Sequence, residues 1–334
     1  MKPVVLFGSP ADSPGACRES ADVALLWRSA GMPVTILPVH PIHPENPWPK
    51  RLADAGCRIE LPSICGKPPD WLRDCIVVAF QCRRAVQCWP HLHKRGCKLV
   101  YLPTHTVILP HEDATFKIYP PTAIVCESEF QRNCLAGSNL HRIPAAFNPS
   151  FFQYRPFIRN GHDFIVGAIG REDPAKWPPR ILNALKAAKK QGVKIRGHFL
   201  GWTPTMEQNS GKLPSWIQHH PPGSVPVDAF LQECHAILCC SDYLENWPRV
   251  VLEAMSSGVP VVADARGGYF EQIKHGETGY LIGNESVAAE CLLTLAEDER
   301  LRLSLAEAAR DSLACLAPPD AIAEAWSRLF SNLG

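Results

Sequence analysis

Short apolar runs alternate with longer amphipathic stretches through the first half of the chain. Runs of branched aliphatic residues predict strands over residues 3–8, 33–39, 76–80, 98–102 and 123–128. The segments between them are helical or loop-like, with a helix expected around residues 16–30. Because strands that alternate with helices are typical of parallel βαβ units, the pattern predicts an α/β fold.

The same rhythm restarts after a break at residues 148–162, where Pro149, Pro156 and Gly161 interrupt regular structure. Strands are expected over residues 164–170, 195–201, 236–241, 260–264 and 279–283. Helices are expected near residues 178–191, 227–234, 248–257, 285–316 and 318–334. The pattern therefore predicts two doubly wound, Rossmann-like domains, residues 1–155 and 156–317, which leave a cleft between them.

One stretch departs from this rhythm. Residues 38–50 read PVHPIHPENPWPK, and each proline lacks a backbone N–H and restricts the residue before it. We expect this stretch to form an extended surface loop.

The composition is that of a packed globular protein, because 46% of the 334 residues are hydrophobic and 20% are charged. The opening MKPVVLFGSP is too short for a signal peptide, and no run approaches the length of a membrane span. A cytoplasmic protein is therefore expected.

Fourteen cysteines occur without a CxxC pair, which favours reduced thiols over a disulfide framework. The best metal-binding candidates are Cys82, Cys88, His91, His93 and Cys97. Their spacing matches no tetrahedral zinc module, so we expect scattered thiols and surface histidines and no metal site.

The formal net charge of +1 argues against a protein that wraps nucleic acid along its whole surface. Residues 75–111, however, contain no acidic side chain, and they carry Arg83, Arg84, Lys94, Arg95 and Lys98. This basic segment fits either a solvated positive face or a surface for an anionic partner or acceptor.

The most informative stretch is DYLENWPRVVLEAMSSGVP, residues 242–260. It places Glu253 inside an apolar run, where an ionised carboxylate is costly unless something pairs with it. Pro248 suits the first turn of a helix, and Gly258 suits a left-handed helix stop. The stretch therefore predicts a loop after the strand at 236–241, followed by a short buried helix.

The start of that helix is a candidate donor site. Free backbone N–H groups at a helix N-terminus can bind an anion such as a diphosphate. Glu253, further along the helix, can accept hydrogen bonds from paired hydroxyls such as those of a ribose, and Glu245 is placed to meet the rest of the ligand. The candidate donor-binding residues at the helix start are Asn246, Trp247, Pro248, Arg249 and Val250.

A second candidate site lies in IVGAIGREDPAKWPP, which ends a predicted strand at Gly170. Arg171 and Lys176 follow at its carboxyl end, where ligands bind in open α/β sheets. Two cations there could neutralise a pyrophosphate leaving group, although the pattern by itself also fits ordinary loop charges.

The stretch from 242 to 279 resembles the retaining GT-B glycosyltransferases of the family-four type, the group 1 glycosyl transferases. The signature of that family is two glutamates separated by seven residues, as Glu245 and Glu253 are. The resemblance continues through LEAMSSGVPVVA (252–263), Gly267-Gly268, Glu271 and GETG (276–279).

The resemblance implies roles for these residues. Glu253 would bind the nucleotide ribose, Glu245 would bind the sugar or its surroundings, and Arg171 and Lys176 would clamp the diphosphate. The lysine of the family is usually followed by Gly, whereas Trp177 follows here, which leaves the shape of this loop open.

The first half resembles the family less specifically. LVYLPTH (99–105) is similar to the strand whose final His faces the donor sugar, which makes His105 a candidate catalytic residue; an ordinary loop histidine is the alternative. The loop from Gly8 to Gly15 could lie against the acceptor or the phosphates. By resemblance, the terminal helix at 318–334 crosses back onto the first domain.

We therefore expect a retaining, metal-independent transfer of sugar from a nucleotide-diphosphate donor, most simply a UDP-sugar, to an acceptor hydroxyl, without a cofactor. Retention is implied by the resemblance, and metal independence agrees with the absence of a DxD-type pair beside the donor site. The alternatives are a nucleotide-sugar-binding scaffold with a decayed site, an enzyme that epimerises or hydrolyses the nucleotide sugar, and a transferase that modifies a hydroxylated DNA base. An anionic acceptor, either a phosphorylated small molecule or nucleic acid, would fit the basic segment.

Overall fold

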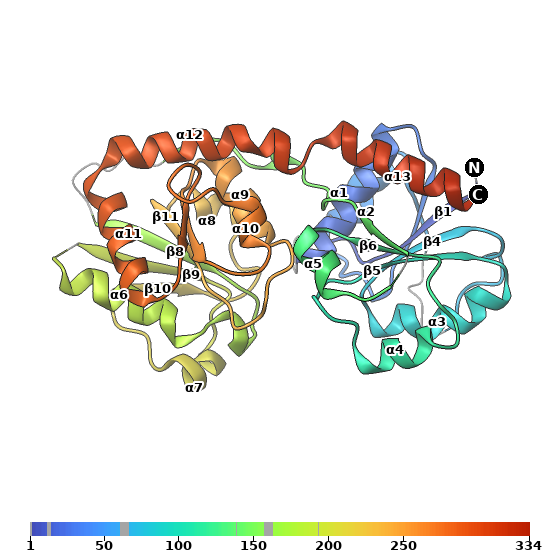
Figure 1. Cartoon of the computed structure of the whole chain (residues 1–334), viewed down its shortest axis with the longest axis horizontal. Helices are drawn as coiled ribbons and strands as arrows, with labels where there is room; N and C mark the ends of the chain where they lie inside the picture. Colours follow the sequence, from blue (N-terminus) through green and yellow to red (C-terminus); the bar gives the residue numbers. More distant parts are fainter. Residues whose placement is uncertain (1, 12–14, 61–66, 138, 157–162, 193) are drawn as a thin grey trace. The chain divides into compact units, whose positions relative to one another are not determined.

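The computed structural model describes residues 2–11, 15–60, 67–137, 139–156, 163–192 and 194–334 (Figure 1). The chain forms two compact units. Unit 1 comprises Met1–Phe147 and Ala317–Gly334, and unit 2 comprises Asn148–Leu316. Each unit is a doubly wound α/β structure.

Unit 1 contains an all-parallel, seven-stranded sheet of order β3-β2-β1-β4-β5-β6-β7. Its strands are β1 Val4–Phe7, β2 Val34–Leu37, β3 Arg58–Ile59, β4 Ile76–Phe80, β5 Lys98–Leu102, β6 Ala123–Cys126 and β7 Leu140–Arg142. All residues of β1 and β4 are buried, because helices cover both faces of the central strands.

The helices of unit 1 are α1 Gly15–Ser29, α2 Trp48–Asp54, α3 Arg83–Lys94, α4 Pro110–Phe116, α5 Glu129–Cys134 and α13 Pro319–Leu333. Figure 1 shows α1 and α13 on one face of the sheet and α3 and α4 on the other. Trp89 and Leu92 of α3 pack into the core that Val77 and Leu99 of the sheet also line.

Unit 2 contains an all-parallel, six-stranded sheet of order β10-β9-β8-β11-β12-β13. Its strands are β8 Phe164–Ile169, β9 Ile195–Leu200, β10 Ile217–His220, β11 Ala236–Cys239, β12 Val261–Asp264 and β13 Tyr280–Ile282. Alternate residues of β8, namely Phe164, Val166 and Ala168, share one core with Leu185 of α6 and Leu292 of α11.

The helices of unit 2 are α6 Pro179–Lys190, α7 Glu207–Ser210, α8 Val227–Leu231, α9 Arg249–Ser257, α10 Tyr269–Gln272, α11 Glu285–Glu297 and α12 Glu299–Leu316. Three short 3₁₀ helices complete the described elements: η1 Pro149–Phe151, η2 Pro174–Lys176 and η3 Pro204–Met206. The α9 helix ends at Gly258, which has a left-handed φ of 79°, as its sequence predicts.

The boundary between the units lies after Phe147, whereas the sequence pattern placed it after residue 155. The physical reason is that residues 154–156 attach to the end of α9. The Arg155 N–H donates to the Ser257 carbonyl at 3.0 Å, and a Cβ on Gly258 would lie 2.9 Å from the Tyr154 ring. The remaining part of the expected break, residues 157–162, lies outside the described residues.

The structure corrects three expectations. The predicted loop at 38–50 ends in the first turn of α2, because Pro49 is tolerated there and Trp48 is fully buried. The helical stretch at 285–316 is interrupted at Asp298, which has extended backbone angles. Strands β3, β7 and β10 were not predicted, since each is a short edge strand with few apolar residues.

The thirteen cysteines that the structure describes are free thiols, and Cys88 and Cys97 lie in the core beside α3. Within the described ranges, no group of three or more His, Cys, Asp and Glu side chains is arranged to hold a metal ion. None of the helices in those ranges has both the length and the apolar character of a membrane-spanning segment.

The C-terminal helix α13 is anchored to α1 by aromatic side chains. Trp326 and Phe330 meet the buried ring of Trp27 edge to face, with ring centroids 5.0 and 5.2 Å apart. All three side chains are at most 2% exposed, so this cluster is part of the core of unit 1.

We expect Trp326→Ala to lower the free energy of unfolding by about 3–5 kcal/mol, because it leaves a cavity against Trp27. Denaturant titration measures this loss. Trp71→Ala is the matched control, since this indole is 47% exposed, and it should change stability by less than about 0.5 kcal/mol. Equal losses in both variants would contradict the anchoring of α13.

Candidate active site

Unit 2 has a topological switch point between β8 and β11. The chain runs outward from β8 through β9 to β10 and then returns to β11, which pairs with β8. The loops after these two strands therefore leave the sheet side by side. In open α/β sheets this is where ligands bind.

The loop after β8 is held in shape from within. Asp173 caps η2 by accepting the Ala175 N–H at 3.1 Å. The Trp177 indole is 1% exposed, and its Nε1 donates to the Arg171 carbonyl at 3.0 Å. The tryptophan that departs from the family pattern therefore fixes this loop.

Asp173 also fixes Arg171, because Asp173 Oδ2 lies 3.0 Å from the Arg171 Nη2. The Tyr243 hydroxyl, from the loop after β11, donates to the same oxygen at 3.0 Å. Burial raises the pKa of Asp173, but the Ala175 N–H, the Tyr243 hydroxyl and Arg171 outweigh burial and lower the pKa. An anionic Asp173 thus joins the two loops through Tyr243.

The face of the Tyr243 ring contacts both candidate cations. Arg171 Cζ is 5.5 Å and Lys176 Nζ is 5.6 Å from the ring centroid. A cation is attracted to the face of an aromatic ring at this distance, so Tyr243 holds Arg171 and Lys176 near each other.

Lys176 and Glu245 form an ion pair between the loops. The Lys176 Nζ donates to Glu245 Oε1, and the two side chains are only 24% and 14% exposed. Partial burial reduces solvent screening of this pair. Two predicted site residues, 69 positions apart in the sequence, are therefore in direct contact.

The Glu245 loop is shaped by Gly267 and Gly268, which follow β12. The Gly268 N–H donates to the Glu245 carbonyl at 2.8 Å. A Cβ on Gly267 would lie 2.6 Å from the backbone carbonyl oxygen of Glu245. A Cβ on Gly268 would lie 1.7 Å from the backbone carbonyl oxygen of Asn246. Only glycine permits this close approach between the two backbones.

The partly buried carboxylate of Glu253 has a cationic neighbour on its own helix. Arg249 Nε lies 3.8 Å from Glu253 Oε1, and the side chains are 7% and 13% exposed. The pair is one helical turn apart, so the i, i+4 spacing itself supplies the compensating charge.

The predicted donor residues Asn246, Trp247, Pro248 and Arg249 are buried, and Val250 is partly exposed. Pro248 is the N-cap residue of α9 and makes no side-chain capping bond. These residues form the loop and first turn that carry Glu245 and Glu253.

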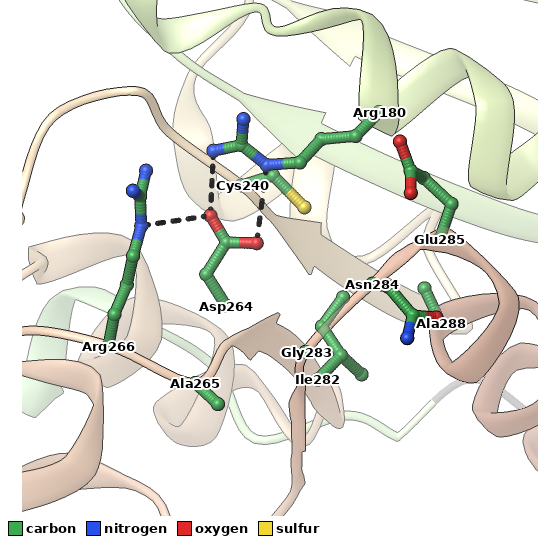
Figure 2. Close-up of a pocket in the computed structure, with 10 residues that line it drawn as sticks. All are labelled: Arg180, Cys240, Asp264, Ala265, Arg266, Ile282, Gly283, Asn284, Glu285 and Ala288. Carbon is green, nitrogen blue, oxygen red and sulfur yellow. Dashed lines mark hydrogen bonds and ion pairs between the residues drawn. The ribbon is translucent and has the colours of Figure 1, made fainter.

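Arg180 of α6 stabilises the loop after β11 by hydrogen bonds. Its guanidinium donates to Asp264 Oδ2 at 2.9 Å, to Asp242 Oδ1 at 2.6 Å and to the Ser241 carbonyl. Figure 2 shows the Asp264 carboxylate between Arg180 and Arg266, at one side of a cavity of about 170 Å³. Burial lowers the pKa of Arg180, but Asp264 and Asp242 outweigh burial and raise it.

Unit 1 has its own switch point, between β1 and β4. Gly8 follows β1 and packs on α1, since a Cβ there would lie 2.8 Å from Ser20 Cβ. Gly15 begins α1, and residues 12–14 of the predicted Gly8–Gly15 loop lie outside the described residues. His105 is partly exposed and follows β5, and its Nδ1 is 2.8 Å from Gln81 Oε1.

The structure thus brings Gly170, Arg171, Lys176, Glu245 and the start of α9 together at one edge of unit 2, while Gly8, Gly15 and His105 belong to unit 1. Sequence reasoning missed four supporting residues: Asp173, Tyr243, Arg180 and Asp264. Of these four, only Asp173 could have been predicted from the sequence, because an Asp directly before Pro is typical of a helix N-cap.

Comparison with protein families places this site in context. Residues 152–312 match the family described as Glycosyl transferases group 1. The chain is 41% identical over 71 residues to the N-acetyl-alpha-D-glucosaminyl L-malate synthase of Bacillus anthracis, which covers 21% of this chain and 19% of that protein. It is 32% identical over 131 residues to the D-inositol 3-phosphate glycosyltransferase of Mycolicibacterium paratuberculosis, which covers 37% of this chain and 29% of that protein. The matches thus span less than a third of either relative.

Solved structures match over nearly the whole chain. Anabaena HepE in complex with UDP and glucose has a TM-score of 0.74 at 16% identity, covering 98% of this chain and 99% of that one. The sucrose-phosphate synthase of Thermosynechococcus elongatus has a TM-score of 0.76 at 16% identity, covering 100% and 99%. The predicted GT-B fold, with two parallel α/β domains, is thereby confirmed.

The close approach of Gly268 to Asn246 leads to a stability prediction. Gly268→Ala should lower the free energy of unfolding by about 1–3 kcal/mol, because the added Cβ overlaps a backbone oxygen and the loop must move. Thermal unfolding measures the change. Gly283→Ala is the control, since a Cβ there meets nothing within 4 Å. Equal stability of Gly268→Ala and Gly283→Ala would contradict the close approach of the Gly268 backbone to the Asn246 carbonyl.

Proposed function

We propose that the protein transfers a sugar from a nucleotide-diphosphate donor to an acceptor hydroxyl, a proposal supported by the match of residues 152–312 to the glycosyl transferases group 1 family. The observation that carries the proposal is the placement of Arg171 and Lys176 at the switch point of unit 2, beside Glu245 and the start of α9. These are the groups that departure of a diphosphate requires.

Charge develops on the diphosphate as the bond between the anomeric carbon and its phosphate oxygen breaks. Arg171, Lys176 and the N-terminus of α9 stabilise that charge, because fixed cations and dipoles need no reorganisation during the reaction. The acceptor oxygen forms the new bond on the same face of the sugar, and its proton passes to a phosphate oxygen of the donor. This route retains the anomeric configuration and uses the two cations where other transferases use a divalent metal.

We assign Glu253 to the ribose hydroxyls and Glu245 to the sugar side of the donor. A carboxylate accepts hydrogen bonds from vicinal hydroxyls, and Glu253 lies one turn into α9, away from the helix start that holds the phosphates. UDP is the favoured nucleotide, which is supported by the UDP complex of structurally similar HepE. His105 of unit 1 completes the set of proposed reaction residues.

The acceptor class that we favour is a small anionic molecule. The names of two relatives contain L-malate and D-inositol 3-phosphate, both of which are anions. The acid-free segment 75–111 of unit 1 presents Arg83, His93 and Lys94 as exposed side chains. A phosphorylated or carboxylated hydroxy compound is therefore the first acceptor to test, ahead of a hydroxylated base in DNA.

Removing either clamp cation should slow the reaction. We expect Arg171→Ala and Lys176→Ala each to reduce kcat by about 100-fold or more, by analogy with the loss of one oxyanion-stabilising group. Release of UDP from UDP-sugars in the presence of hydroxy-acid and sugar-phosphate acceptors measures the rate. Lys186→Ala, which removes an exposed lysine of α6, is the matched control. Near-normal rates in both clamp variants would contradict this assignment.

Donor binding has an independent test. UDP at one hundred times its Kd should stabilise the wild-type protein by about 2.7 kcal/mol, measured as a rise in Tm. Glu253→Ala should weaken UDP binding by at least about tenfold, because hydrogen bonds to a charged group are lost, whereas Glu297→Ala on the exposed end of α11 should not.

Two results would favour the alternatives. Stabilisation by UDP without turnover on any acceptor would indicate a nucleotide-sugar-binding scaffold. Turnover only on DNA with hydroxylated bases, together with binding that weakens steeply with salt, would indicate a DNA-modifying transferase. Failure of every nucleotide diphosphate to raise Tm would overturn the donor site itself.

A further inference from the structure

Two glutamines, one fully buried and one partly exposed, fix the loop that carries His105. Gln131 of α5 is fully buried, and its Nε2 donates to the carbonyls of Pro103 at 2.6 Å and His105 at 2.9 Å. Gln81, which follows β4, accepts the backbone N–H groups of Thr104 at 2.8 Å and His105 at 3.0 Å through its Oε1. Gln131 thus donates hydrogen bonds to carbonyl groups of the loop, and Gln81 accepts hydrogen bonds from its N–H groups.

The neighbours of Gln81 determine its orientation. Its Nε2 donates at 2.9 Å to Oε2 of Glu112, a fully buried residue whose same oxygen accepts the Leu109 N–H at 2.8 Å. The other end of the carboxamide faces two backbone N–H groups, so this end must be the oxygen. Glu112 therefore sets the direction of Gln81.

This orientation in turn sets the protonation of the imidazole. His105 Nδ1 lies 2.8 Å from Gln81 Oε1, and an amide oxygen can only accept a hydrogen bond. Nδ1 therefore carries the proton, and in the neutral ring Nε2 carries the lone pair.

We propose that Gln81 is a positioning residue that holds His105 as the Nδ1–H tautomer, so that Nε2 presents a lone pair to a hydroxyl donor. An Nε2 lone pair suits a hydroxyl donor, whereas an Nε2–H would suit a phosphate oxygen. The use of His105 in sugar transfer rests on the proposed function, but the tautomer follows from the geometry of unit 1 alone.

Nitrogen NMR of the ¹⁵N-labelled full chain tests the tautomer directly. The His105 signals are assigned by their loss in His105→Gln. The wild-type ring should show a protonated Nδ1 and an unprotonated Nε2 at a pH where the ring is neutral. Gln81→Leu should shift both nitrogens toward the averaged values of a tautomer mixture, and Gln87→Leu, on the exposed face of α3, should not.

Turnover supplies the second readout. Gln81→Leu should lower kcat by about 10- to 100-fold, by analogy with the loss of a hydrogen-bond partner that orients a metal-binding histidine. A wild-type ring in the Nε2–H form would overturn the proposal without any variant, and so would an unchanged tautomer in Gln81→Leu. A changed tautomer with unchanged kcat would overturn the role of Gln81 in the reaction. If the wild type turns over no UDP-sugar, the proposed function fails while the NMR result still decides the tautomer.

Discussion

The ion pair between Lys176 and Glu245 is the interaction on which the candidate active site depends. It joins the loop after β8 to the loop after β11, and these loops are adjacent only because the chain reverses its winding between those strands. The other contacts each hold one side of this pair. Asp173 and Trp177 shape the first loop, whereas the backbone of Gly267-Gly268 and the Arg180–Asp264 pair shape the second.

A common principle explains how the site holds so much charge. Three cations of the candidate site in unit 2 each have a carboxylate beside them: Lys176 has Glu245, Arg171 has Asp173, and Arg249 has Glu253. These pairs offset the cost of partial burial. The cations are therefore already held in place, so the diphosphate of the proposed donor would exchange ion-pair partners rather than order flexible side chains.

Unit 1 achieves the same preorganisation with neutral groups. The loop that carries His105 is held by two carboxamides, which satisfy both its N–H and its carbonyl groups. Leaving a buried amide without hydrogen-bond partners costs several kcal/mol of free energy. This arrangement therefore resists local distortion. The histidine is consequently fixed in both position and protonation.

The sequence by itself determined the two α/β halves, most of the strands, and the α9 helix that ends at Gly258. It also determined that Glu245 and Glu253 lie in one segment, separated by seven residues. These features are local, since hydrophobic period and helix end signals act within a few residues. The tertiary structure alone decided which charges meet. Lys176 and Glu245 are 69 residues apart, and Arg180 and Asp264 are 84 apart. Their contact follows from the order of strands in the sheet, which brings the carboxyl ends of distant strands together and which no local pattern records.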